Sequence, residues 1–247
     1  MYSNILFLLI LILPIPILVY DLRKGINPYR AVLEGAVLAG IGVAVVFIVA
    51  QMTGNSIGEE VDKTIESMAK ILANNDQMAK ATGLTDANRA DRIAAYESLY
   101  SKGAQILPSV LLIASIIVSY IEGLILSHVI RINKVSVNPM PHLRELTLPK
   151  NTIMGWFVIF IASWIMKVMG AGSGDMILAN VNTLFEFTFA LQGMSLLLLV
   201  SHLKKVPKAI PIIVLVVLWL TSIGQSLMFI TGILDLIIDL RKRVSAR

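Results

Sequence analysis

Repeated apolar runs of membrane-spanning length constrain the fold of this chain more than any other feature. A helix of about 20 apolar residues crosses the roughly 30 Å hydrocarbon core of a bilayer. Such segments cover residues 4–20, 31–52, 106–130, 151–170, 178–202 and 209–240, in a chain of mean hydropathy +0.79. The run 5–13 is apolar at every position and does not alternate, which argues against barrel strands. The sequence predicts an all-α fold, a polytopic transmembrane helical bundle forming a single domain over 1–247.

Basic residues at the ends of these segments predict the orientation of the chain in the membrane. Lys and Arg accumulate in cytoplasmic loops, and this bias sets the topology. They follow the first, third and fifth segments and fill the tail: Arg23, Lys24, Arg30, Arg131, Lys134, Arg144, Lys150, Lys204, Lys205, Lys208, Arg241, Lys242, Arg243 and Arg247. We therefore expect a cytoplasmic C-terminus. The basic residues behind the net charge of +5 lie at the ends of these apolar segments, which argues against nucleic acid as a partner.

The segment 209–240 allows two topologies, because basic residues lie at both of its ends. A single crossing by one long kinked helix would place one basic end outside and give six spans. The polar, glycine-containing sequence 221–226 offers a break, so a hairpin of two short limbs would give about seven spans. Limbs of about 15 residues reach only about 22 Å, which requires bilayer thinning, burial or a partly re-entrant path. The distribution of basic residues favours the hairpin.

Residues 53–105 form the one sizeable segment outside the predicted spans. Ser56 and Glu59 match a capping box, and apolar residues then recur at helical spacing over 57–73. A second amphipathic helix is expected over 86–102, so the segment predicts an extracytoplasmic helical pair inserted into the membrane domain. Its apolar face either rests on the bundle or the lipid headgroups, or it serves as a lid or a partner-docking element.

Four acidic residues lie within segments that otherwise match the hydrocarbon core: Glu122, Glu186, Asp235 and Asp239. A charged side chain near the bilayer centre costs about 2.5–3.5 kcal/mol on insertion scales, so such residues face protein or water and often mark function. Asp239 is expected to pair with Arg243 at i+4 spacing near the interface. Asp235 is expected to hydrogen-bond a neighbouring helix, to sit protonated, or to join a site.

Small and polar residues share one face on several predicted helices. Such residues gain nothing from contact with lipid, but they allow two helix backbones to approach closely. These faces are therefore expected in helix contacts. The ridge of Gly35, Ala39 and Gly42 carries no charge and is expected to be packing alone. The other stripes are Ser115, Ser119 and Glu122; Asn182, Glu186, Ala190 and Gly193; and Gly224, Met228, Thr231, Gly232, Asp235 and Asp239.

Depth in the membrane divides the acids that could form a site into two groups. Glu122 and Asp235 lie about 12 Å and about 8 Å from the inner ends of their segments, so they can share a layer. Glu186 lies about 24 Å from its inner end and belongs with Asn180 and Asn182 near the outer face. This separation disfavours a metal site built from three carboxylates.

Motifs for catalysis and for cofactor binding are absent from the sequence. It has no His-Glu-x-x-His, no Gly-x-Ser-x-Gly and no Walker A sequence. It also has no cysteine, which excludes a thiolate nucleophile or ligand. We therefore expect no enzyme activity, no catalytic residues, no cofactor and no metal site.

Several short motifs resemble the YybS-like family of bacterial multi-spanning membrane proteins of unknown function. The likeness covers most of residues 10–245. The fold of that family is thought to be remotely similar to the substrate-binding components of energy-coupling-factor vitamin transporters. The motifs are the sequence 143–149, Asn182 with 191–193, the run 232–243 and the proline-containing sequence 13–16.

This resemblance implies a bundle that holds a small solute near its outer face, beneath a loop. Segment 53–105 would then be the cover, and the pocket would consist of Asn180, Asn182, Glu186 and Gln192. A cavity lined by acids without bases suits protons, cations or amine-bearing solutes. We therefore expect binding or transport of a small solute or cation in the bacterial inner membrane, with a membrane or ATPase partner.

The alternative function is of a different class. The protein would be a non-catalytic membrane scaffold or assembly factor, and the helices 57–73 and 86–102 would dock its partner. Both functions require contact with the lipid bilayer itself.

Overall fold

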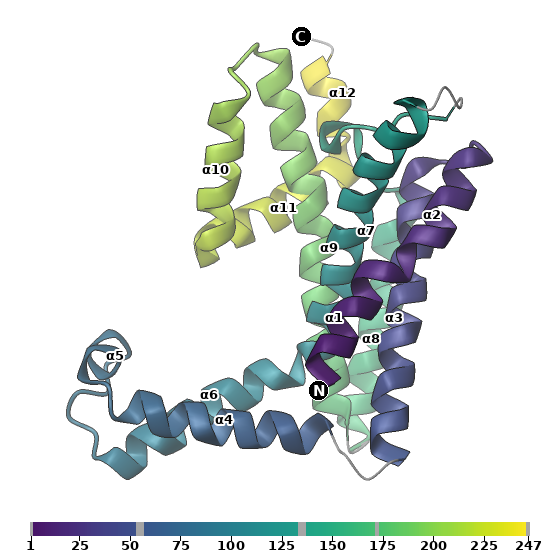
Figure 1. The fold of residues 1–247 in the computed structure, drawn as a ribbon. Coiled ribbons are helices and arrows are strands. Elements are labelled where there is room, and N and C mark those ends of the chain that lie inside the picture. The colour runs from purple at the N-terminus through teal and green to yellow at the C-terminus, as the bar shows by residue number, and fades with distance from the viewer. Residues whose placement is uncertain (1, 53–56, 133–136, 171–172, 246–247) are drawn as a thin grey trace. The chain divides into compact units, whose positions relative to one another are not determined.

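The computed structural model describes residues 2–52, 57–132, 137–170 and 173–245. Every regular element in these ranges is a helix, which confirms the all-α prediction (Figure 1). The chain divides into two compact units, Met1–Leu126 and Ser127–Arg247. The single domain over 1–247 stays a prediction.

The described ranges contain twelve α-helices and one short 3₁₀ helix. In chain order they are α1 (Tyr2–Ile12), α2 (Pro14–Arg23), α3 (Pro28–Met52), α4 (Ile57–Ala73), α5 (Asp76–Ala81), α6 (Arg89–Gln105), α7 (Leu107–Ile132), η1 (Leu143–Glu145), α8 (Asn151–Val168), α9 (Gly174–Leu203), α10 (Ala209–Leu220), α11 (Ser222–Ile238) and α12 (Leu240–Ser245).

Five segments of the described chain are long and apolar enough to cross a membrane, or six if the bent pair α10–α11 counts as one span. They agree with the first five predicted segments to within a few residues. The five are Asn4–Arg23, Pro28–Ala50, Leu107–Ile132, Asn151–Val168 and Gly174–Leu203.

The predicted break within 209–240 is confirmed, and the two limbs meet at a sharp bend. α10 ends at Leu220, α11 begins at Ser222, and the two helices are bent by 111°. Thr221 lies between them and accepts the N–H of Gly224 through Oγ1 at 3.2 Å, which caps α11. A bend beyond 90° turns α11 back toward the side from which α10 enters. The 12 residues of α10 reach only about 18 Å, so this geometry favours a hairpin or re-entrant path over one kinked helix.

We expect both ends of the α10–α11 pair on the same side of the membrane. Because the chain has no cysteine, Lys208→Cys and Lys242→Cys each introduce a single thiol. A membrane-impermeant maleimide should label both variants from the same face of sealed vesicles and neither from the other face. Labelling from opposite faces would show that the segment crosses the membrane once.

The membrane helices of the first unit pack through the predicted ridge of small residues on α3. A Cβ built at Gly35 would lie 3.1 Å from Pro14 Cβ of α2 and 3.4 Å from Ser119 Oγ of α7, so three helices approach closely here. Ala39 is fully buried, and a Cβ at Gly42 would overlap the side chain of Leu13. The interpretation of this ridge as packing is confirmed.

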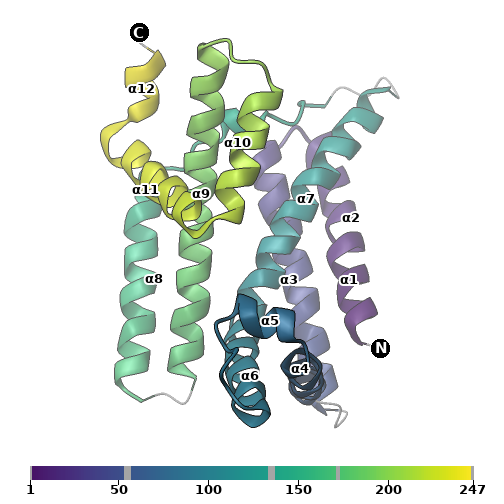
Figure 2. The same ribbon diagram turned by 90° about the vertical axis from the view of Figure 1, so that its left-hand side faces the viewer.

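The insertion 53–105 forms a pair of helices, α4 and α6, which lie side by side (Figures 1 and 2). The first helix has the predicted bounds, while Ser56 of the expected capping box lies outside the described residues. Apolar and aromatic side chains between the two helices form a small core of their own. It contains Ala69, Ala73 and Tyr96, with Leu72, Leu84, Ile93 and Tyr100 packed against them.

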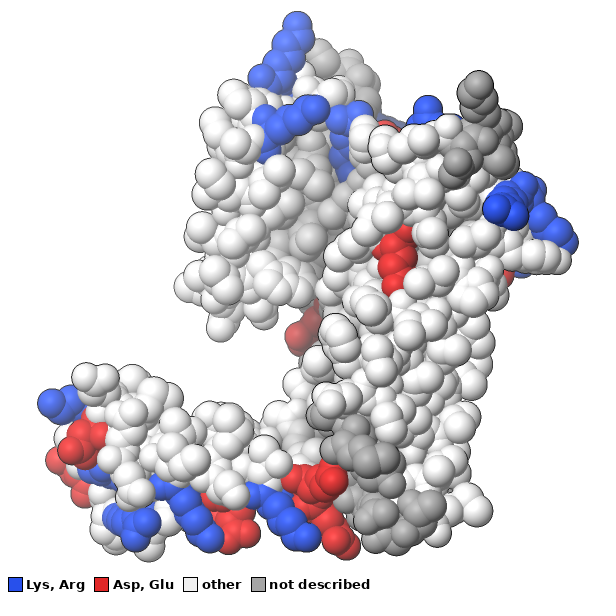
Figure 3. Space-filling view, viewed as in Figure 1, with Lys and Arg blue, Asp and Glu red and all other residues white. Residues whose placement is uncertain are grey.

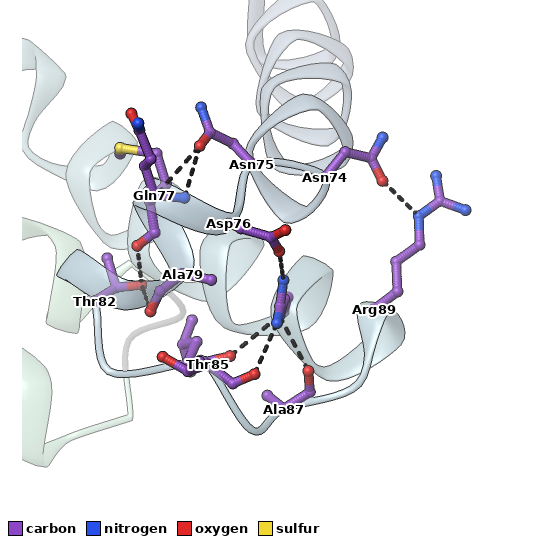
Figure 4. Close-up of polar contacts among 12 residues, drawn as sticks. Asn74, Asn75, Asp76, Gln77, Ala79, Thr82, Thr85, Ala87 and Arg89 are labelled. Carbon is purple, nitrogen blue, oxygen red and sulfur yellow. Dashed lines mark hydrogen bonds and ion pairs between the residues drawn. The ribbon is translucent and has the colours of Figure 1, made fainter.

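Polar contacts hold the tip of this pair together (Figure 4). Asn75 caps α5 by accepting two backbone N–H groups. α6 begins at Arg89, three residues later than expected, because Asn88 provides its N-cap. Arg92 pairs with Asp76 at 3.2 Å and keeps the preceding residues out of the helix by bonding their backbone. Its guanidinium donates to the carbonyl oxygens of Leu84, Thr85 and Ala87.

In the second unit, α9 and α11 cross at a contact built from two glycines. A Cβ at Gly193 would overlap the carbonyl oxygen of Met228, and a Cβ at Gly232 would overlap that of Phe189. Both glycines belong to predicted stripes, so their role in helix contact is confirmed. Around this crossing, Phe185 makes ring contacts at centroid distances of 4.8 to 6.1 Å with Trp156, Phe160, Phe189 and Phe229.

Candidate functional site

Asp235 is buried where α11 crosses α9, and its carboxylate accepts three hydrogen bonds. Gln192 of α9 donates from Nε2 to Oδ2 at 2.5 Å. Arg241 of α12 donates from its backbone N–H to Oδ1 and from Nε to Oδ2, both at 3.0 Å. Gln192 is fully buried and Asp235 is 3% exposed. Charge-assisted hydrogen bonds of this kind offset the cost of burying the carboxylate and fix its geometry.

The same side chains fasten the segment 143–148 to α9. Arg241 Nη2 donates to Ser195 Oγ at 2.6 Å, and Ser195 lies one turn after Gln192. We call Gln192, Ser195, Asp235 and Arg241 the Asp235 cluster. At distances of 2.6 to 3.2 Å, the cluster binds the carbonyl oxygens of Leu143, Arg144 and Leu146 and the N–H of Leu148.

A left-handed residue explains how Arg241 reaches Asp235. α11 ends at Ile238, and Asp239 has φ of 50°, a conformation that Asp tolerates better than most residues. In a continuous helix, positions 235 and 241 would point to different faces. The turn at Asp239 redirects the chain, so α12 folds Arg241 back onto the carboxylate.

The expected pair of Asp239 with Arg243 is wrong, because two lysines already occupy the Asp239 carboxylate. Its carboxylate instead pairs with Lys150 at 2.7 Å and with Lys242 at 3.7 Å. The hydrogen bond from Lys150 holds the pKa of Asp239 below its ordinary value, and the charges of Lys150 and Lys242 act in the same direction.

This lowered pKa makes a pH-dependent contribution to stability that can be measured. A group with a depressed folded-state pKa stabilises the fold above its unfolded pKa of about 4, and the contribution is lost as pH falls through the folded value. We expect Asp239→Asn, which keeps the left-handed turn, to lower the melting temperature slightly at neutral pH and not at all in strong acid. A melting series over pH checks this. A difference that is equal at every pH would assign the effect to the turn and not to the charge.

Two residues of the predicted outer group come together on α9. Asn182 Nδ2 donates to Glu186 Oε1 at 2.7 Å, and the side chain of Glu186 is exposed. Asn180 Nδ2 donates to the carbonyl oxygen of Met176 on its own helix at 2.8 Å. Gln192, expected in the same pocket, lies on another face of α9 and bonds Asp235. The carboxylate–amide pair therefore stands apart from the Asp235 cluster.

Glu122 lies on α7 in the first unit, on the predicted stripe with two serines. Ser115 Oγ donates to the carbonyl oxygen of Leu111 at 2.8 Å. Ser119 Oγ and Glu122 Oε2 are buried and have no hydrogen-bond partner among the described residues. A layer shared by Glu122 and Asp235 would join the two units, so it stays a prediction.

An acidic group that the sequence patterns did not predict lies at the junction of α2 and α3. Asp21 is 2% exposed, its carboxyl group lies next to that of Glu34, and Glu34 pairs with Arg30 at 2.6 Å. The i, i+4 spacing of Arg30 and Glu34 could have predicted this ion pair. The ion pair borders an open groove of about 390 Å³, whose other lining residues are Ile17, Leu33, Val37, Leu38 and Ile41.

The arrangements differ in what they can do chemically. Each carboxylate oxygen of Asp235 already accepts a donor, so a solute would have to displace Arg241 or Gln192 to reach it. Glu186 and Glu122 keep acceptor capacity for a ligand. Within the described ranges, no group of three or more His, Asp or Glu residues could hold a metal ion.

Five apolar helices of spanning length, with acids placed inside them, define a polytopic helical membrane protein. The chain belongs to the family described as "Predicted membrane protein (DUF2232)", whose model matches residues 1–236. It is also 21% identical over 229 residues to the uncharacterized protein YybS of Bacillus subtilis (strain 168), a match covering 90% of this chain and 70% of that protein. The resemblance to the YybS-like family is therefore confirmed. No solved structure matches the chain significantly.

Proposed function

We propose that this membrane protein binds a small solute or a cation through the carboxylate of Glu186, without catalysing a reaction. Glu186 lies about 18 Å from the first residue of α9, well inside a helix of 30 residues. A carboxylate at this depth costs about 2.5–3.5 kcal/mol unless water, a cation or a donor meets it. The exposed side chain of Glu186, bonded by Asn182, is the observation that carries the proposal.

The charge of the site favours cationic ligands. None of the ion pairs among the described residues includes Glu186, so no basic residue in the described ranges neutralises it. Protons, metal cations and protonated amines each supply the missing positive charge. Glu122, with its buried and unpartnered Oε2, offers a second acceptor of the same kind.

The setting of the proposed function follows from the distribution of basic residues. We place the chain in a bacterial inner membrane with its C-terminus in the cytoplasm. Transport, as distinct from binding, would require an energy source, and a membrane or ATPase partner could supply it.

Uptake into proteoliposomes tests this function, with radiolabelled sodium and radiolabelled spermidine as the two probes. Glu186→Gln removes the charge and keeps the shape, so uptake or retention of the accepted probe should fall to background. Asp175→Asn is the matched control: Asp175 is an exposed carboxylate at the start of the same helix, paired with Lys167 at 2.8 Å. Glu122→Gln in the same assay tests the second acceptor. Equal uptake by wild type and both glutamine variants would refute the assignment.

A further inference from the structure

The helical pair α4–α6 carries large apolar side chains that its own core does not cover. Met68 and Ile71 of α4 are 48% and 69% exposed, and Leu99 of α6 is 59% exposed. Met68 and Ile71 are three positions apart, so they share one face of α4. The core between the helices uses other positions, namely Ala69, Ala73 and Tyr96. The pair therefore has an apolar face in addition to the one that joins its two helices.

Charged side chains occupy a separate face of the same helix. Their spacing of four, three and four positions puts Glu59, Lys63, Glu66 and Lys70 on one stripe of α4. Figure 3 shows the acidic and basic side chains of the pair gathered along its lower edge. In this view the upper edge, on the side toward which the membrane helix α3 extends, shows no charged side chain between the tip of the pair and the membrane helices.

The attachment of the pair fixes it at the boundary of the membrane. Only residues 53–56 lie between the membrane helix α3 and α4, and only Ile106 lies between α6 and the membrane helix α7. α4 and α6 run across the direction of α3, lengthwise in Figure 1 and end-on in Figure 2. The pair therefore extends along the membrane plane from an anchor at the bilayer surface.

We infer that α4–α6 lies on the bilayer surface, with Met68 and Ile71 of α4 inserted at the boundary between headgroups and acyl chains. The separation of charged from apolar side chains and the orientation of the pair both favour the bilayer as the surface that covers this apolar face. The uncharged edge faces the bilayer, and the charged edge faces water, as in helices that lie in a membrane interface. This inference does not depend on ligand binding by Glu186.

Fluorophores attached at single cysteines distinguish lipid from water around the pair. Ile71→Cys and Lys63→Cys place one thiol on the apolar face and one on the charged face of the same helix. With an environment-sensitive NBD label in vesicles of phosphatidylcholine and phosphatidylglycerol, the label at position 71 should emit at shorter wavelength. Lipids carrying a doxyl quencher on the acyl chain should quench it about threefold more than the label at position 63.

A second pair of measurements keeps the inference open to refutation. Met68→Cys should behave as Ile71→Cys does, and matching circular dichroism and gel filtration should show that the labelled variants are folded. Equal, weak quenching at all three positions would show that the pair projects into water. A label at position 71 that is shielded in native membranes but unquenched in the pure lipid vesicles would assign the face to a protein partner. Either outcome overturns the bilayer assignment.

Discussion

Replacing Arg241 with glutamine is expected to destabilise the second unit by about 3–5 kcal/mol, the usual cost of removing one partner from a buried ion pair. The Arg241 side chain is 15% exposed and donates one of the three hydrogen bonds to Asp235 from Nε, while the backbone N–H of the same residue donates another. Without the guanidinium, the carboxylate loses its charged partner. The segment 143–148 also loses a bond to the carbonyl oxygen of Arg144.

Arg243→Gln is the matched control for this prediction, since Arg243 lies on the same short helix and is exposed. Unfolding in detergent, followed by tryptophan fluorescence, should show a large loss for Arg241→Gln and little change for Arg243→Gln. The double variant Asp235→Leu with Arg241→Gln should recover part of the loss, because it leaves no unpaired buried charge. Equal stability of the two single variants would mean that the cluster contributes nothing to the fold.

Gly232→Ala is expected to destabilise the protein by about 2 kcal/mol or more, although alanine is normally the better helix former. The added Cβ would overlap the carbonyl oxygen of Phe189, so α9 and α11 would have to separate. Separation weakens the ring contacts around Phe185 and lengthens the bond between Gln192 and Asp235.

Gly155→Ala should have the opposite sign, which makes it an informative control. Gly155 lies in α8, and a Cβ added there meets no atom within 4 Å. Only the higher helix propensity of alanine then changes the stability, so the free energy of unfolding is expected to rise by up to about 1 kcal/mol. The two alanine variants, unfolded side by side, separate packing from propensity. Equal destabilisation of both variants would show that the close contact between α9 and α11 at Gly232 is not the cause.

Much of the architecture was predictable because local patterns determine it. Apolar runs fixed the five long spans, and the polar sequence 221–226 marked the break before α11. The spacing of Gly193 and Gly232 among apolar residues identified the surfaces where helices approach. Each of these signals is contained within one segment of the chain.

The partners of Asp235 were not predictable from such patterns. The bond to Gln192 joins residues that are 43 positions apart, and nothing local selects it. The turn at Asp239 was hidden because the surrounding residues favour a continuous helix, and this led to the incorrect pairing of Asp239 with Arg243. Asp21 was overlooked for a different reason, since a basic cluster beside it suggested the end of a span.

The Asp235 cluster also orders events during synthesis of the protein. Its parts emerge in sequence: first the segment 143–148, then Gln192 and Ser195 on α9, then Asp235, and finally Arg241. Until α12 folds back onto α11, the carboxylate has no cationic partner from α12, so water or the insertion machinery must accompany it. The second unit therefore closes only after α12 has been made. A chain truncated before Arg241 should therefore leave this half of the protein in an open, protease-sensitive state.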